Sequence, residues 1–165
     1  MKNIEFLNNF YKDIAGIAEK LDKPAIEKLV KSIYSIKKKK GRIFFLGVGG
    51  SAGNCSHAVN DFRKICEIEC YTPLDNVSEL TARINDDGWE SSLTNWLKIS
   101  KLNSKDAIFI FSVGGGDIKR KVSVNLINSI KYAKNKRIKI FGIVGRKKSF
   151  LKLHGSDVIE IPQVN

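Results

Sequence analysis

Short apolar runs alternate with longer amphipathic stretches along most of this sequence, and two of the runs end in clusters of glycine. RIFFLGVGG (42–50) and DAIFIFSVGGG (106–116) pass from bulky apolar residues into glycines, and EIECYT (67–72), RIKIFGIVG (137–145) and DVIEIP (157–162) are similarly apolar. Strands of a parallel sheet are buried on both faces, so they read as continuous apolar runs with helical crossovers between them. The alternation therefore predicts an α/β fold whose parallel sheet is covered by helices on both faces.

The segments between the runs have helical spacing. Residues 3–21 place apolar residues at steps of three and four, which predicts an amphipathic helix, and Asp22 with Pro24 starts a second one. Further helices are expected over 52–65, 76–87, 90–101, 118–134 and 149–153. The two N-terminal helices have no strand before them, so their apolar faces must pack on the domain or on another subunit. We expect one domain over residues 1–165, with N-terminal helices in 1–40 and the sheet core in 41–165.

The sequence is basic, with 29 lysines and arginines against 17 aspartates and glutamates, a net charge of +12. Such an excess fits nucleic acid, a membrane surface or small anionic substrates. The densest run, Lys37–Lys40, is interpreted as a solvated helix end, where lysine also complements the helix dipole. No aromatic-interleaved basic patch or nucleic-acid motif accompanies the charge, so nucleic acid is not the expected partner.

Cysteine usage and the N-terminus bear on the compartment. The N-terminus lacks the continuous apolar segment of a signal peptide, and no stretch approaches the length of a membrane span. Cys55, Cys66 and Cys70 form no C-x-x-C pair. This argues against a disulfide framework or a structural zinc site and fits reduced thiols. We therefore expect a cytoplasmic protein with no membrane partner.

The two glycine clusters indicate where a ligand would bind. Each directly follows a strand and precedes an expected helix, and the helix N-terminus exposes unpaired N–H groups that attract anions. Ligands of open parallel sheets sit beyond the carboxyl ends of the strands, at a switch point in strand order. Glycine also lets the backbone approach a ligand closely. A single such turn is usually only a turn, but two at equivalent strand ends predict an anion site.

A dinucleotide is one candidate ligand. Gly47-x-Gly49-x-x-Ala52 matches the dinucleotide fingerprint, with Glu69 about 20 residues further on. However, Glu69 falls inside the expected second strand, whereas an acid that binds ribose belongs at the carboxyl end of that strand. The helix after the turn also opens with polar residues, so the fingerprint is a weak signal here.

A second reading explains more of the sequence. Two helices are followed in order by GVGGSAGNCSHAVNDF, NDDGW, FSVGGGD, FGIVG and DVIEIP. This order resembles the sugar isomerase (SIS) family, and within it the phosphoheptose isomerases, over about residues 3 to 163. The resemblance implies a flavodoxin-like three-layer α/β/α sandwich with a five-stranded parallel sheet, and a homotetramer built with the N-terminal helices. It also implies isomerisation of sedoheptulose 7-phosphate to D-glycero-D-manno-heptose 7-phosphate through an enediol, for bacterial lipopolysaccharide or capsule synthesis.

The resemblance also assigns roles to residues. His57 matches a family zinc ligand, and Asp61 falls where the family has a catalytic, metal-binding glutamate, so this pair is expected to be catalytic and zinc is the implied cofactor. Residues four apart share a helix face, which allows both side chains to face one site. The implied contacts to the phosphorylated sugar are Val48, Gly49, Gly50, Ser51, Asn85, Asp86, Ser112, Val113, Gly114 and Asp117.

Simpler interpretations of the same residues stay open. His57 fits a surface histidine and Asp61 a solvated carboxylate. Asn85-Asp86 fits a helix stop followed by a turn, and Asp117 fits the N-cap of a helix that starts at Ile118.

The sequence departs from the family pattern at four points, and two of them, Asp61 and the altered second loop, motivate an alternative, a non-catalytic SIS protein that binds a sugar phosphate or serves as a scaffold. Asp61 is one methylene shorter than glutamate, and a base misplaced by about 1 Å can lose on the order of 100-fold in rate. Only Ser112 represents the serines of the second loop, and Val48 replaces an asparagine. The family's last helix, with a glutamine and a histidine, is not among these 165 residues, and we expect it to follow Asn165 in the full protein.

Overall fold

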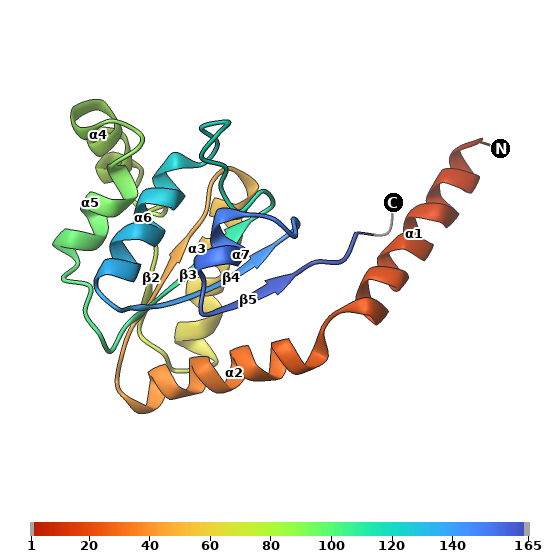
Figure 1. The fold of residues 1–165 in the computed structure, drawn as a ribbon, viewed down its shortest axis with the longest axis horizontal. Coiled ribbons are helices and arrows are strands. Elements are labelled where there is room, and N and C mark those ends of the chain that lie inside the picture. The colour runs from red at the N-terminus through yellow and green to blue at the C-terminus, as the bar shows by residue number, and fades with distance from the viewer. Residues whose placement is uncertain (1, 164–165) are drawn as a thin grey trace.

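The computed structural model describes residues 2–163 and contains a five-stranded parallel sheet with the order β2-β1-β3-β4-β5 (Figure 1). All four pairings between neighbouring strands are parallel, which confirms the fold class expected from the sequence. The second strand is shorter than the apolar run that predicted it. The strands are β1 (Ile43–Leu46), β2 (Cys70–Tyr71), β3 (Ala107–Ser112), β4 (Lys139–Val144) and β5 (Asp157–Glu160).

Helices cover both faces of the sheet. The described helices are α1 (Lys2–Lys20), α2 (Lys23–Lys38), α3 (Gly50–Lys64), α4 (Val77–Asp87), α5 (Ser92–Ile99), α6 (Val124–Asn135) and α7 (Phe150–His154). Residues of α5, α6 and α7 share one buried cluster, and residues of α2 and α3 share the other. The three-layer sandwich is therefore confirmed.

The pleat of the strands divides the core between the two layers. Phe44 and Leu46 pack in the cluster with α5, α6 and α7, whereas Ile43 and Phe45 pack in the cluster with α2 and α3. Successive side chains of a strand point to opposite faces. A wholly apolar strand is thus required because both faces are covered.

The first helix, α1, projects away from the body of the domain (Figure 1). It leaves large apolar side chains exposed, namely Ile4, Phe6, Leu7, Phe10, Tyr11 and Ile14. No helix in the described part of the chain is long and apolar enough to cross a membrane. The structure thus leaves the apolar face of α1 uncovered by the rest of its own chain.

The helix expected over 118–134 begins six residues later, at Val124. Asp117 and Val122 pair instead as an isolated antiparallel bridge, and the Asp117 carboxylate accepts a hydrogen bond from the Arg120 N–H at 3.0 Å. Ser123 then adopts a left-handed conformation with φ 54°. Asp117 therefore closes a turn, and the expectation that it caps a helix starting at Ile118 is wrong.

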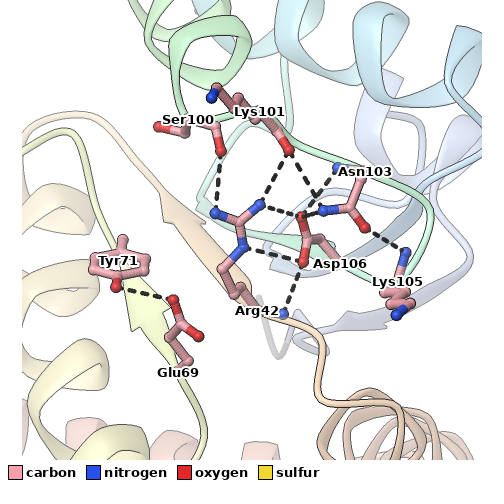
Figure 2. Close-up of polar contacts among 8 residues, drawn as sticks. All are labelled: Arg42, Glu69, Tyr71, Ser100, Lys101, Asn103, Lys105 and Asp106. Atoms are coloured by element: carbon pink, nitrogen blue, oxygen red, sulfur yellow. Dashed lines mark hydrogen bonds and ion pairs between the residues drawn. The ribbon is translucent and has the colours of Figure 1, made fainter.

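A buried ion pair joins the starts of β1 and β3 (Figure 2). The Asp106 carboxylate accepts hydrogen bonds from the backbone N–H, Nε and Nη2 of Arg42, and from the backbone N–H and Nδ2 of Asn103. The guanidinium also donates to the carbonyls of Ser100 and Lys101, each at 3.1 Å. The hydrogen bond to Asp106 raises the pKa of Arg42, although burial opposes this. The network fixes the amino ends of both strands.

A second carboxylate attaches α2 to the edge strand β5. Asp157 forms an ion pair with Lys28 at 2.8 Å and accepts a hydrogen bond from the Ser32 hydroxyl at 2.8 Å. Burial by itself would raise the pKa of Asp157. The hydrogen bonds from Lys28 and Ser32, with the charges of Lys28 and Lys139, outweigh that effect and hold the pKa below its usual value.

Candidate functional site

The strand order places both glycine turns at one point of the sheet. Strands β2 and β3 lie on opposite sides of β1, so the connections after β1 and β3 leave the carboxyl edge in opposite directions. Leu46 pairs with Ile110 near that edge, which brings the two turns next to each other. This is the topological switch point where ligands of such sheets bind.

A hollow of about 290 Å³ lies at this point. Three residues of its lining were expected in the site, Ser51 from the first turn and Ser112 and Val113 from the second. The whole lining is Ser51, Asn54, Phe111, Ser112, Val113, Ile143, Val144, Gly145 and Ile161. The two turns therefore contribute to one concave surface.

The first turn runs from Gly47 to the start of α3. Gly49 is the N-cap residue, with φ 61° and ψ −127°, a conformation that essentially only glycine adopts. No side chain caps the first turn of α3. Gly49 and Gly50 are exposed, whereas Val48 is half-buried against the core. The start of α3 is thus a bare backbone facing the carboxyl edge.

The second turn is held by the elements around it. The Ser112 hydroxyl accepts a hydrogen bond from the Gly115 N–H at 2.9 Å and keeps its own proton to donate. The carbonyls of Gly115 and Gly116 accept hydrogen bonds from the first N–H groups of α7, at 2.9 and 3.2 Å. Both glycines have positive φ. A Cβ at Gly115 would overlap the Ser149 side chain, so this turn requires glycine for space as well as for conformation.

His57 and Asp61 lie on α3 outside the lining of the hollow. Nε2 of His57 and Oδ2 of Asp61 lie 3.1 Å apart, and the two side chains are 78% and 42% exposed. The other Asp61 oxygen accepts from the Asn60 side-chain amide at 3.1 Å. The two residues therefore form a pair, as their spacing predicted, on the solvent side of the helix.

The metal expectation was compared with the side chains that are present. Structural zinc sites use four protein ligands, and catalytic ones use three. His57 and Asp61 supply two, and within residues 2–163 no group of three or more His, Cys, Asp or Glu side chains could hold a metal ion. The side chains of a single chain therefore do not provide enough ligands for zinc at this point.

The remaining polar residues expected in the site lie elsewhere. Asn85 and Asp86 are exposed on the last turns of α4, where the Asn85 amide donates to the Asp86 carboxylate at 2.8 Å. Asp117 closes the turn described above. None of the three belongs to the lining of the hollow, and their place in the site stays a prediction.

Sequence reasoning did not select Asn54, Gly145 and Ile161, which also line the hollow. Asn54 follows Ser51 by three residues and so shares its helix face. Gly145 ends the run RIKIFGIVG, and its N–H donates to the Val113 carbonyl at 3.0 Å. Gly145, a third glycine at a strand end, could therefore have indicated from the sequence that this turn also lines the site. The exposed cations Arg146, Lys147 and Lys148 follow it directly.

A larger hollow, of about 610 Å³, lies between the α1–α2 bend and the end of β5. Its lysines, Lys20, Lys147 and Lys152, are accompanied by the carboxylates Asp22 and Glu160. It lies away from the switch point and contains neither glycine turn. We therefore place the candidate site at the smaller hollow.

The position of Glu69 does not support the dinucleotide interpretation. Glu69 directly precedes β2, at the amino edge of the sheet, where its carboxylate accepts a hydrogen bond from the Tyr71 hydroxyl at 2.9 Å (Figure 2). A ribose-binding acid belongs at the opposite end of that strand. The cysteines offer no nucleophile near the hollow either, because burial raises the pKa of the Cys55 and Cys70 thiols to about 12.

Solved structures share this architecture. A phosphoheptose isomerase from Neisseria gonorrhoeae aligns with a TM-score of 0.81 and 19% identity, over 100% of this chain and 89% of that one. A phosphoheptose isomerase from Francisella tularensis aligns with a TM-score of 0.82 and 18% identity, over 99% of this chain and 85% of that one. The sugar isomerase domain of an RpiR transcription factor from Sphaerobacter thermophilus aligns with a TM-score of 0.63 and 14% identity, over 99% of this chain and 78% of that one. No protein-family model and no curated protein sequence matches the chain. The resemblance to SIS proteins is confirmed for the fold.

Proposed function

We propose that this chain is an SIS-type isomerase that binds a sugar phosphate at the carboxyl edge of the sheet and interconverts its ketose and aldose forms. The observation that carries the proposal is that Ser51 and Ser112, from two separate glycine turns, line one hollow at the switch point. The substrate we propose is sedoheptulose 7-phosphate, with D-glycero-D-manno-heptose 7-phosphate as product.

The phosphate would be held mainly by backbone and by nearby charge. The start of α3 has no side-chain cap and presents the positive end of a helix dipole, although the N–H groups of Ser51 and Ala52 already donate to the carbonyls of Val48 and Gly49. The hydroxyls of Ser51 and Ser112 add donors. The exposed cations Arg146 and Lys147 adjoin Gly145 in the lining and favour a dianion electrostatically. Together these groups take the place of the missing serines of the second loop.

The carbon chain of the sugar would extend from the hollow along α3. Asn54 lines the hollow, and His57 lies three residues further, about 4.5 Å along the helix axis. The His57–Asp61 pair would remove a proton from C1 of the ketose, while the carbonyl oxygen at C2 gains one, which gives the enediol. Return of a proton to C2 and loss of the C1 hydroxyl proton give the aldose. The step needs no oxidant or reductant.

The test is turnover of sedoheptulose 7-phosphate by the whole chain in D2O, followed by NMR. We expect aldose that carries deuterium at C2, because the enediol is reprotonated from solvent. His57→Gln and Asp61→Asn should each lower the rate at least about 100-fold. Ser56→Ala is the matched control on α3, since its hydroxyl bonds the Ala52 carbonyl outside the hollow, and it should retain the rate.

A non-catalytic SIS protein is the second candidate, and one observation favours it. His57 and Asp61 lie against each other on the solvent side of α3 and do not line the hollow. In that case sugar phosphates would raise the melting temperature without turnover, and Ser112→Ala would reduce the shift. If neither turnover nor stabilisation by a sugar phosphate is seen, both candidates are wrong.

We also propose that α1 packs against further copies of the chain, as in a homotetramer. Its exposed apolar side chains include Phe6, Phe10 and Ile14, at 68%, 50% and 47% exposure. Such a stripe is costly in water at roughly 25 cal/mol per Å². Phe6→Asp with Phe10→Asp should convert the assembly to monomer in light scattering, whereas Tyr34→Ser, on α2, should not.

A further inference from the structure

Three helix-to-strand turns lie side by side at the amino edge of the sheet, opposite the candidate site. They connect α2 to β1, α5 to β3 and α6 to β4 (lower left in Figure 1). Ile43 pairs with Ala107, and Ala107 pairs with Lys139, so the three neighbouring strands begin at the same level. A Cβ at Gly41 would overlap the Lys105 carbonyl, which shows that the first two turns are in contact.

Each of the three turns has a basic residue in the left-handed conformation. Lys40, Lys101 and Arg137 have φ of 53°, 51° and 56°, and all three are exposed. They occupy the position after the helix C-cap, which glycine most often fills. The turns have the same hydrogen bonds, with Gly41 N–H to Ile36 O, Leu102 N–H to Leu97 O, and Ile138 N–H to Ala133 O, at 3.0, 3.3 and 2.9 Å.

Helix stability alone does not account for these three residues. Glycine adopts the left-handed conformation without the steric cost that a lysine or arginine incurs. A cation near a helix C-terminus recovers part of that cost. The last turns of α2, α5 and α6 already contain basic residues, however, namely Lys37, Lys38, Lys98 and Lys134.

The turns collect further cations with little neutralisation. Lys38, Lys39, Lys105, Lys136 and Lys139 are also exposed at this edge. Within residues 2–163, none of these five side chains, nor the three left-handed ones, forms an ion pair with a carboxylate. Three nearby carboxylates have other partners: Asp106 is paired with Arg42, Glu67 with Lys37, and Glu69 accepts a hydrogen bond from the Tyr71 hydroxyl. Glu67 and Glu69 also line a hollow with Lys40, and the charge of Lys139 acts on Asp157, so these two lysines are partly neutralised without a direct ion pair.

We propose that this edge, defined by the eight basic residues of the three turns, binds the phosphodiester backbone of a nucleic acid. Neighbouring strands are about 4.8 Å apart, so the turns form a row of cations along the edge. A row fits a linear polyanion, whereas a small phosphate needs donors that converge in a cavity and a membrane needs a broad plane of cations. The Lys38 ammonium lies 4.9 Å from the centroid of the exposed Tyr34 ring. The eight residues are themselves cations, so the contacts are mainly to phosphates and carry little sequence preference.

Nucleic acid was not the partner expected from the sequence alone. The cations come from segments around residues 38–40, 101–105 and 136–139, which are far apart in the chain and form no contiguous motif. The parallel fold collects them because every helix that covers the sheet runs back toward the amino edge. The edge is independent of the candidate site at the opposite end of the strands.

The test is fluorescence anisotropy of the whole chain with labelled oligonucleotides of about 20 nucleotides, longer than the ~4–16 of a typical single-strand site. The variant K40G/K101G/R137G removes three charges and installs the residue that these turns favour. We expect this variant to bind about 10-fold more weakly or worse. Each lost contact to a phosphate lowers the slope of log K against log salt by about 0.7–0.9, so loss of three contacts should make the slope shallower by about 2–3. Its melting temperature should not fall below that of the wild type.

A matched control removes the same charges elsewhere. K119G/R120G/K121G takes two lysines and one arginine from the carboxyl edge and should bind within about twofold of the wild type. A second variant, K39Q/K105Q/K136Q, spares the three left-handed positions and should also weaken binding. Equal losses in the control, unchanged binding in the first two edge variants, or wild-type binding to phosphatidylserine vesicles but not to oligonucleotides would each overturn the proposal.

Discussion

Removing the Asp106 carboxylate should be among the most destabilising single changes on the sheet. In Asp106→Ala, the Arg42 guanidinium loses its only carboxylate partner within the described residues. Backbone N–H groups of Arg42 and Asn103 lose their acceptor as well. Asp106 is 1% exposed, so these groups surround a position that water does not reach freely.

The size of the effect follows from how much water can replace the carboxylate. Breaking a buried ion pair costs about 3–5 kcal/mol. The Arg42 side chain is 22% exposed and keeps its bonds to two carbonyls, which reduces the loss. We therefore expect about 2–4 kcal/mol in the free energy of unfolding. For a domain of this length that lowers the melting temperature by roughly 5–15 °C.

The measurement is urea unfolding followed by circular dichroism, with the slope m checked for two-state behaviour. Glu67→Ala is the control, because its pair with Lys37 is long, at 3.4 Å, and exposed. It should cost at most about 1 kcal/mol. The double variant Arg42→Met with Asp106→Ala should lose little more than Asp106→Ala alone. If Asp106→Ala loses no more than Glu67→Ala, the network does not stabilise the strand starts as described.

Three further outcomes are expected. The folded-state pKa of Asp157 lies below its unfolded value, so its contribution to the free energy of unfolding is present above about pH 3.8 and is lost as pH falls through the lower folded value. In Asp157→Asn, the urea midpoint should therefore change less between pH 6 and pH 3 than in the wild type. Gly49→Ala should cost about 1–3 kcal/mol of stability, because alanine is strained at φ 61° and ψ −127°, whereas Gly50→Ala should cost nothing measurable by the same assay. Iodoacetamide at pH 8 should label the exposed Cys66 and not the buried Cys55, whose pKa is about 12, as mass spectrometry of the native protein would show.

Much of the fold could be predicted from local pattern. Residues 43–46 and 107–111 are apolar at every position because both faces of the sheet are covered, and the Asp22 and Pro24 signals placed the start of α2 correctly. The late start of α6 was missed for a physical reason. A short antiparallel bridge between Asp117 and Val122 and the left-handed Ser123 interrupt a segment whose spacing alone fits a helix.

The candidate site was less accessible to sequence reasoning. Strand order decides which turns meet, and the sequence does not contain it in local form. Two glycine turns at strand ends were a usable signal, and Ser51 with Ser112 met as expected. Spacing placed His57 and Asp61 on one helix face, but only packing determines that this face points to solvent. The roles of the site residues stay predictions.

The second glycine turn limits how this protein can be re-engineered. The carbonyls of Gly115 and Gly116 hold the start of α7, and Ser149 and Ile127 fill the space where side chains at these two positions would stand. A graft that places serines at both positions must therefore exchange the α7 segment together with the loop, whereas Gly114 has open space for a side chain.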